Sequence, residues 1–113
     1  MAKEADPDHG LLQGTLDLLL LRALRLEPLH GYGVTQRLGQ ITEGTCRFQA
    51  GSVFPALYRL EREGVLKSHW ARTESGRRAK YYALTAAGRR KLEREQRNWE
   101  RIALAVARVI DAT

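Results

Sequence analysis

The amino-acid sequence predicts a mainly α-helical fold with one small β-hairpin, and two observations lead to this class. Apolar residues recur at helical spacing in three segments between residues 14 and 64, and again between residues 86 and 111. Between these helical segments, residues 65–85 follow the two-residue period of β-strands around a Ser-Gly turn. A chain of 113 residues has room for one domain with an additional helix.

The first predicted helix covers residues 14–27, with Thr15 as its N-cap. Its leucines occupy more than half of the helical circumference, which indicates burial on more than one side. A domain this small has few internal surfaces to cover such a helix. We therefore predict that Leu16 and Leu20 contact a second subunit.

A turn rich in helix-breaking residues, PLHGYG, precedes the second predicted helix at residues 31–41. His30 lies in this turn, where we expect it to bond the backbone. Val34, Leu38 and Ile41 give the helix one buried face, because they lie at spacings of i, i+4 and i+7. A loop then leads to a third helix.

The third predicted helix occupies GSVFPALYRLEREG, residues 51–64, with Ser52 as its cap and Gly64 at its end. Apolar residues at helical spacing give it one buried face. The outer face is then formed by Pro55, Tyr58, Arg59 and Arg62. Two guanidinium groups and a phenol on one face suit contact with an anionic partner.

Two strands are predicted at residues 65–72 and 80–85, and they form a hairpin. We expect Tyr82 to lie in the core and Trp70 to pack between strand and helix. The tip region carries Arg77, Arg78 and Lys80.

The final predicted helix starts after Thr85 as its cap and ends near Asp111. Apolar side chains recur in it at the a and d positions of a coiled coil, which indicates pairing with another helix. A homodimer is the simplest assembly that buries this seam. We predict that the dimer interface contains Leu92, Trp99, Ile102, Val106 and Val109.

Three helices, a hairpin and a terminal helix follow one another in the order of a winged helix-turn-helix. The third helix would be the recognition helix and the hairpin the wing. The expected division is a disordered tail at residues 1–10, a winged helix-turn-helix domain at 11–84 and a C-terminal dimerisation helix at 85–113.

Positive charge is concentrated in the segment that holds these two elements. The chain has a net charge of +6, and residues 51–94 hold eleven Lys or Arg against four Asp or Glu, a net of +7. A helix fits the major groove of B-DNA, where arginine donates to guanine or phosphate. We predict contacts to double-stranded DNA from Ser52, Pro55, Tyr58, Arg59, Arg62, Arg77, Arg78 and Lys80. Two-fold symmetry would place two recognition helices about one DNA turn apart, on a pseudo-palindromic operator.

Two other interpretations of the basic surface stay open. Glu61 and Glu63 could neutralise the arginines within a solvated surface, or the basic face could meet an acidic protein. Catalysis is not expected, because the sequence has no Ser/His/Asp set, no phosphate-binding loop and no paired acids in an apolar setting. Scattered histidines and the single Cys46 predict no metal and no cofactor.

The N-terminus MAKEADPDHG is polar and acidic, unlike a signal peptide, and the apolar run LDLLLLRALRL is too short and too charged for a membrane span. Together with the single cysteine, these features predict a cytoplasmic protein.

The sequence resembles the PadR family of bacterial transcriptional regulators along nearly its whole length from residue 11. The resemblance is carried by GTLDLLLLRAL, LHGYGV, GSVFPALYRLEREGVL, GRRAKYYALTAAGRRKL and NWERI. It implies a homodimeric repressor with a winged helix for DNA and a C-terminal helix for dimerisation, of the short PadR-like subgroup. By motif match, the recognition helix holds Ser52, Pro55, Tyr58 and Arg59, and the wing holds Gly76, Arg77, Arg78 and Lys80.

One position departs from the family pattern. The family usually has tyrosine before the proline, and this chain has Phe54, so a phosphate contact from a hydroxyl is not expected there. PadR-like proteins respond to aromatic small molecules, some of them at the dimer interface. The resemblance therefore makes Trp99 a candidate effector residue, since two facing rings would leave a slot for a flat apolar ligand.

Overall fold

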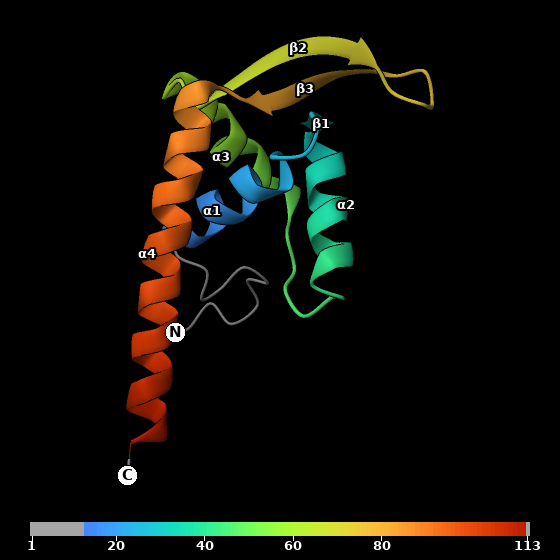
Figure 1. Cartoon of the computed structure of the whole chain (residues 1–113). Coiled ribbons are helices and arrows are strands. Elements are labelled where there is room, and N and C mark those ends of the chain that lie inside the picture. Colours follow the sequence, from blue (N-terminus) through green and yellow to red (C-terminus); the bar gives the residue numbers. More distant parts are fainter. Residues whose placement is uncertain (1–12, 113) are drawn as a thin grey trace.

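The computed structural model describes residues 13–112, so the tail predicted at residues 1–10 lies outside the described residues. The elements follow in the order α1 (Gln13–Ala23), β1 (Leu29–His30), α2 (Gly31–Ile41), α3 (Ala50–Arg62), β2 (Leu66–Arg72), β3 (Arg78–Leu84) and α4 (Ala86–Asp111). The first three helices lie on one side of an antiparallel sheet of order β1–β3–β2, and α4 runs down the edge of the molecule (Figure 1). This arrangement confirms the predicted mainly α-helical class.

A single apolar core joins α1, α2 and α3 to the base of the hairpin and the first half of α4. Its largest fully buried side chains are Leu20, Leu21, Val34, Val53, Leu57 and Leu60. Each such side chain contributes roughly 1.5–3 kcal/mol when it leaves water, so packing holds these helices in place. The predicted buried faces of α2 and α3 are confirmed except at Ile41, which is 66% exposed.

The first helix and the turn after it differ from the prediction. α1 ends at Ala23 instead of residue 27, and Thr15 lies inside it instead of capping it. Pro28 disfavours helical backbone at the residue before it, and the chain then forms β1, which pairs with β3. Leu26 is consequently 81% exposed, although the prediction placed it within the helix. The sheet therefore has three strands where two were predicted.

The end of α3, the start of β2 and the start of α4 meet at one junction. Gly64 closes α3 as predicted, with a left-handed φ of +82°. Thr85 caps α4 as predicted, because its side-chain oxygen accepts from the Gly88 N–H at 3.0 Å. The same hydroxyl donates to the Gly64 carbonyl at 2.7 Å, and the Thr85 N–H donates to the Val65 carbonyl at 3.1 Å. These bonds fix α4 to the domain at its first turn.

Two residues assigned to the subunit interface lie elsewhere. Leu20 and Leu92 are 0% and 4% exposed in the chain's own core, so both predictions are wrong. The physical reason is that α1 packs against α4, so these apolar sides of the two helices cover each other within one chain. Leu16 is partly buried against the same core.

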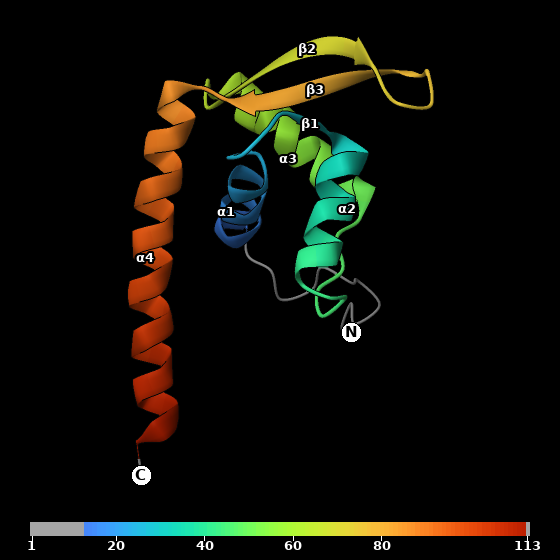
Figure 2. The same cartoon turned by 45° about the vertical axis from the view of Figure 1, so that its right-hand side comes forward.

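The second half of α4 extends away from the other helices and strands, as both views show (Figures 1 and 2). The large apolar side chains exposed along it are Trp99, Ile102, Leu104, Val106, Val109 and Ile110. None of the helices in the described range 13–112 is long and apolar enough to cross a bilayer.

Candidate nucleic-acid interface

Side chains on α3 meet three different surroundings. Val53, Ala56, Leu57 and Leu60 are buried in the core. Pro55, Tyr58 and Arg62 form an exposed outer strip, as predicted. Between these two strips, the flanks of the helix hold charged side chains that bond to neighbouring elements.

Arg59 lies on a flank of α3 and is bound within the chain. Its guanidinium donates to Asp17 of α1, with Nη2–Oδ1 at 2.6 Å and Nη1–Oδ2 at 3.2 Å. Nη1 also donates to Glu63 Oε2 at 3.2 Å. The hydrogen bond to Asp17 raises the pKa of Arg59 above its usual value. The expectation that Arg59 points outward is therefore wrong, because its guanidinium is bound to Asp17 of α1.

Lys80 is also bound within the chain, in the middle of β3 and away from the hairpin tip. Its Nζ lies 2.9 Å from Glu61 Oε1, and the Ser68 hydroxyl donates to Glu61 Oε2 at 2.6 Å. Glu61 is on α3, Ser68 on β2 and Lys80 on β3. The prediction that placed Lys80 at the tip is corrected, because this cluster fixes the wing against the helix.

The Glu61 cluster stabilises the fold over a defined pH range. Hydrogen bonds from Ser68 and Lys80 lower the pKa of Glu61. The stability that Glu61 contributes is therefore present above the pKa of an unfolded glutamate and is lost as the pH falls through the lower folded-state pKa. The hydrogen bond with Glu61 raises the pKa of Lys80. The stability that Lys80 contributes is present below the pKa of an unfolded lysine and is lost as the pH rises through the higher folded-state pKa. Both are fully present at neutral pH.

The remaining predicted cations stay available to a partner. Arg77 lies in the hairpin turn, which Gly76 shapes with a φ of +90°, and Arg78 begins β3. Within the range 13–112, no salt bridge involves Arg62, Arg77 or Arg78. Ser52 was predicted to cap α3, but it lies in the first turn of the helix. The N-cap is Gln49, so this prediction is wrong.

The prediction that Trp70 packs between strand and helix is wrong, since the residue is 57% exposed. The Arg78 guanidinium carbon lies 5.1 Å from the centroid of its ring. Both residues line a groove of about 520 Å³ between the hairpin and the starts of α2 and α3, together with Tyr32 and Phe54. Arg77 and Lys80 contribute to the lining, and no carboxylate does. Sequence reasoning missed this groove because alternation gives the face of a strand but not how far the hairpin extends past the core.

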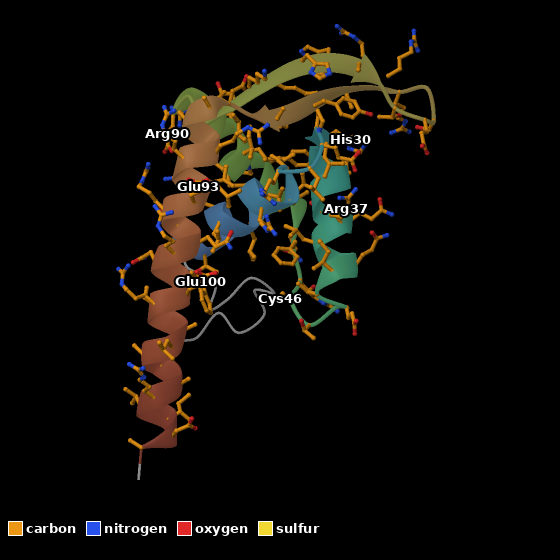
Figure 3. All side chains as sticks on the ribbon, in the orientation of Figure 1. His30, Arg37, Cys46, Arg90, Glu93 and Glu100 are labelled. Carbon is orange, nitrogen blue, oxygen red and sulfur yellow. The ribbon has the colours of Figure 1, made fainter. Side chains whose placement is uncertain are left out.

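The start of α2 borders this groove. His30 Nδ1 accepts from the Gly33 N–H at 3.0 Å, which confirms the predicted bond to the backbone and caps α2 where it leaves the sheet (Figure 3). The Phe54 ring lies edge-on to Tyr32, with centroids 5.2 Å apart. A Cβ at Gly31 would collide with the Phe54 ring, so the two helix starts touch closely. Phe54 is thus a packing residue, a role that needs no hydroxyl.

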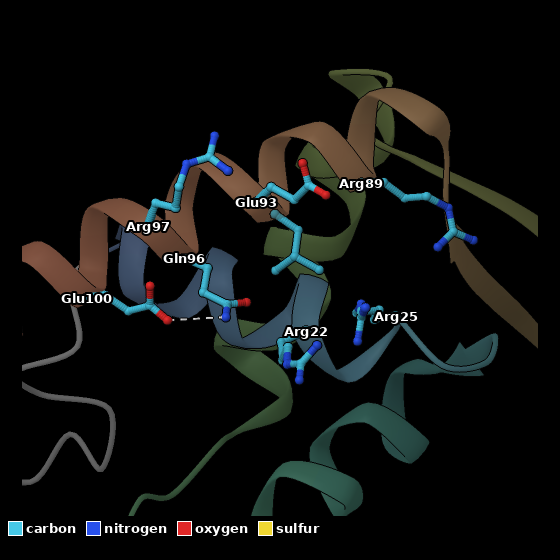
Figure 4. A pocket seen from close by; sticks show the side chains of 8 residues that line it. Arg22, Arg25, Arg89, Glu93, Gln96, Arg97 and Glu100 are labelled. Carbon is cyan, nitrogen blue, oxygen red and sulfur yellow. Dashed lines mark hydrogen bonds between the residues drawn. The ribbon is translucent and has the colours of Figure 1, made fainter.

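A second groove, of about 500 Å³, lies between the end of α1 and the first half of α4 (Figure 4). Its charged lining consists of Arg22, Arg25, Arg89, Arg97, Glu93 and Glu100. Because it mixes both signs, it lacks the purely cationic character of the groove beside the wing. In the described part of the chain, no three metal-ligating side chains come together.

Comparisons with known sequences identify relatives of this chain. The sequence profile of the "Transcriptional regulator PadR-like family" matches residues 20–94. "Transcriptional regulator Rv3488" of Mycobacterium tuberculosis is 36% identical over 78 residues, which are 69% of each chain. An uncharacterized 37.1 kDa protein in transposon TN4556 of Streptomyces fradiae is 35% identical over 85 residues, which are 75% of this chain and 23% of that protein.

Solved structures share the fold. The structure of smu.1704 from Streptococcus mutans UA159 superposes with a TM-score of 0.80 at 22% identity, over 90% of this chain and 92% of that one. A PadR family transcriptional regulator from Eggerthella lenta DSM 2243 superposes with a TM-score of 0.76 at 31% identity, over 89% and 86%. These comparisons confirm the predicted winged helix, and the relatives that carry a functional name are regulators of transcription and not enzymes. The chain belongs to the PadR-like family of transcriptional regulators.

Proposed function

We propose that this chain is a sequence-specific repressor that binds double-stranded DNA as a homodimer. Membership of a family of DNA-binding regulators supports the general activity. The observation that carries the specific proposal is the basic surface shared by the outer strip of α3 and the wing. There Arg62, Arg77 and Arg78 form no salt bridge with any residue in the range 13–112.

The proposed contacts follow from which side chains are still available. The outer strip of α3 enters the major groove and presents Ser52, Pro55, Tyr58 and Arg62 to base edges and phosphates. Arg77 and Arg78 of the wing contact the adjacent backbone. The groove beside the wing then faces the sugar–phosphate backbone of the DNA. Trp70 and Tyr32, which line this groove and are exposed, pack against that backbone. We assign Arg59 and Lys80 to holding the helix and the wing in place.

Arg62→Ala is expected to weaken operator binding by about 1–3 kcal/mol, because it removes a forked donor from the recognition surface. Stability should barely change, since Arg62 is exposed, with its guanidinium carbon 5.4 Å from the centroid of the Tyr58 ring. Fluorescence anisotropy with the upstream region of its own gene measures the affinity, and Arg97→Ala on α4 is the matched control. Unchanged operator affinity would reject α3 as the reader. A wild-type protein that prefers no duplex over random DNA would favour a module that binds an acidic protein.

The double variant Arg77→Ala/Arg78→Ala is expected to weaken binding to all duplexes alike. Each lost phosphate contact should lower the slope of log affinity against log salt by roughly one unit. Titrations at several salt concentrations measure this slope. A loss confined to the specific operator would instead show that the wing reads sequence.

The homodimer is proposed from the apolar stripe on the second half of α4. Ile102, Val106 and Val109 are 51%, 49% and 75% exposed, and they lie along the same seam as Trp99. A second copy of α4 would bury this stripe. Two recognition helices related by two-fold symmetry would then read a pseudo-palindromic operator.

Release by an aromatic effector is proposed at Trp99, which is 44% exposed on the seam. A flat apolar ligand between two such rings would alter DNA affinity only if it prefers one dimer geometry. In a Trp70→Phe background, Trp99 fluorescence should be quenched by a panel of planar phenolics and dyes, with saturation and a parallel loss of operator affinity. A panel that changes neither signal would leave Trp99 as a packing residue.

A further inference from the structure

We propose that Asp17 is a positioning residue for DNA recognition, which acts through Arg59 to set the rotation of α3 about its own axis. This inference rests on the proposed function, because it assumes that α3 reads DNA. It assigns a role to a carboxylate on a leucine-rich helix that touches no part of the proposed DNA surface.

The burial of Asp17 calls for a specific partner. It is 5% exposed, and it is the one charged side chain in the described part of the chain that is buried. A carboxylate in such surroundings is strongly unfavourable unless it is paired and hydrogen-bonded. Arg59, 42 positions away in sequence, supplies two hydrogen bonds that engage both carboxylate oxygens.

Stability alone does not account for this pair. Apolar side chains of similar volume often replace a buried ion pair without loss of stability, and α1 already packs against α3 through leucines. Apolar contacts are non-directional, whereas a two-point bond between a guanidinium and a carboxylate fixes both distance and angle. The pair therefore adds orientation to a contact that packing has already stabilised.

A second bond holds the opposite flank of α3. Glu61 bonds to Ser68 and Lys80 of the hairpin, while Arg59 bonds to α1. Bonds on both flanks restrain rotation in both directions. Side chains on a helix reach about 6 Å from its axis, so a 20° rotation would move an outer group such as that of Arg62 by about 2 Å, beyond the tolerance of a hydrogen bond.

The decisive variant replaces the pair with apolar side chains, as Asp17→Leu/Arg59→Met. We expect this protein to fold and dimerise like the wild type, since no buried charge is left unpaired. Glu63 loses its bond to Arg59, but its side chain is 44% exposed, so water can solvate the carboxylate. Its ratio of operator affinity to random-duplex affinity should fall on the order of tenfold, comparable to losing about one base-pair contact. The slope of log affinity against log salt should stay unchanged, because Arg59 contacts no phosphate in this proposal.

Two results would overturn the proposal. A double variant with the wild-type affinity ratio would show that the pair only stabilises the fold. A salt slope lowered by about one unit would show that Arg59 itself contacts DNA. If the double variant does not fold, Arg59→Lys keeps the charge but loses the forked geometry, and it should lower the ratio by a smaller factor. An unchanged ratio in a folded Arg59→Lys protein would equally contradict the proposal.

Failure of the proposed function gives a different result. In that case the wild-type protein itself would show no preference for its operator, and Arg62→Ala would change nothing. If the wild type prefers its operator and the Asp17→Leu/Arg59→Met protein keeps that full preference, only the proposed role of Asp17 is refuted.

Discussion

Ile102→Glu is expected to convert the proposed dimer into monomers and to lower operator affinity by about 10²–10⁴-fold. The affinity loss has this size because a monomer gives up the second, intramolecular binding event on a two-fold site. Ile102 is 51% exposed in the single chain, so the domain should still fold. In the dimer, a carboxylate at this position would be buried without a partner. Light scattering measures the mass and circular dichroism the helix content.

Leu104→Glu is the matched control for this experiment. Leu104 is also 51% exposed, and it lies two residues further along α4, about 200° around the helix from Ile102. The same apolar-to-acid change should leave the dimer intact, because this side chain lies off the seam. An intact dimer with Ile102→Glu would place the interface elsewhere, and a monomeric Leu104→Glu would place the seam on the other side of α4.

The parts of the fold that depend on local spacing could be predicted from the sequence. α2, α3, the hairpin and α4 were found from apolar periods, and Gly64 and Thr85 were found as end signals because helix ends have local chemistry. β1 was missed because it exists only through pairing with β3, some fifty residues away. Phe48 was missed because it reaches the core from a loop, where no period marks it.

The candidate site was predicted only as far as a helical projection allows. The helical projection predicts that Tyr58 and Arg62 are exposed, and the structure confirms both positions. It placed Arg59 with them because it gives the angle of a side chain but not the neighbour that the side chain meets. One signal could have corrected this prediction. Asp17 lies among the leucines of a helix predicted to be buried on more than one side, and a buried acid requires a cation from another element.

Gly88→Ala is expected to destabilise the protein by about 2 kcal/mol, although alanine favours helices over glycine by about 1 kcal/mol. Gly88 is buried in the first turn of α4. A Cβ there would overlap the Val65 carbonyl oxygen and come within 3.1 Å of its carbonyl carbon. These are backbone atoms, and the oxygen accepts the Thr85 N–H, so they cannot rotate away as a side chain could. Relief requires α4 to shift, and overpacking of this kind costs about 1–3 kcal/mol or more, which outweighs the helix propensity.

Gly39→Ala separates the two effects by denaturant unfolding. Gly39 is in α2 with no atom within 4 Å of an added Cβ, so it should gain up to about 1 kcal/mol from helix propensity. If Gly88→Ala stabilised the protein as much as Gly39→Ala, the backbone at Val65 would have moved to make room for the added Cβ.

Operator affinity should fall in Gly88→Ala even where the protein remains folded. α4 has 26 residues, so a tilt of 5° at its first turn would move its far end by about 3 Å. A displacement of that size at the proposed seam would change the spacing of the two recognition helices in the proposed dimer.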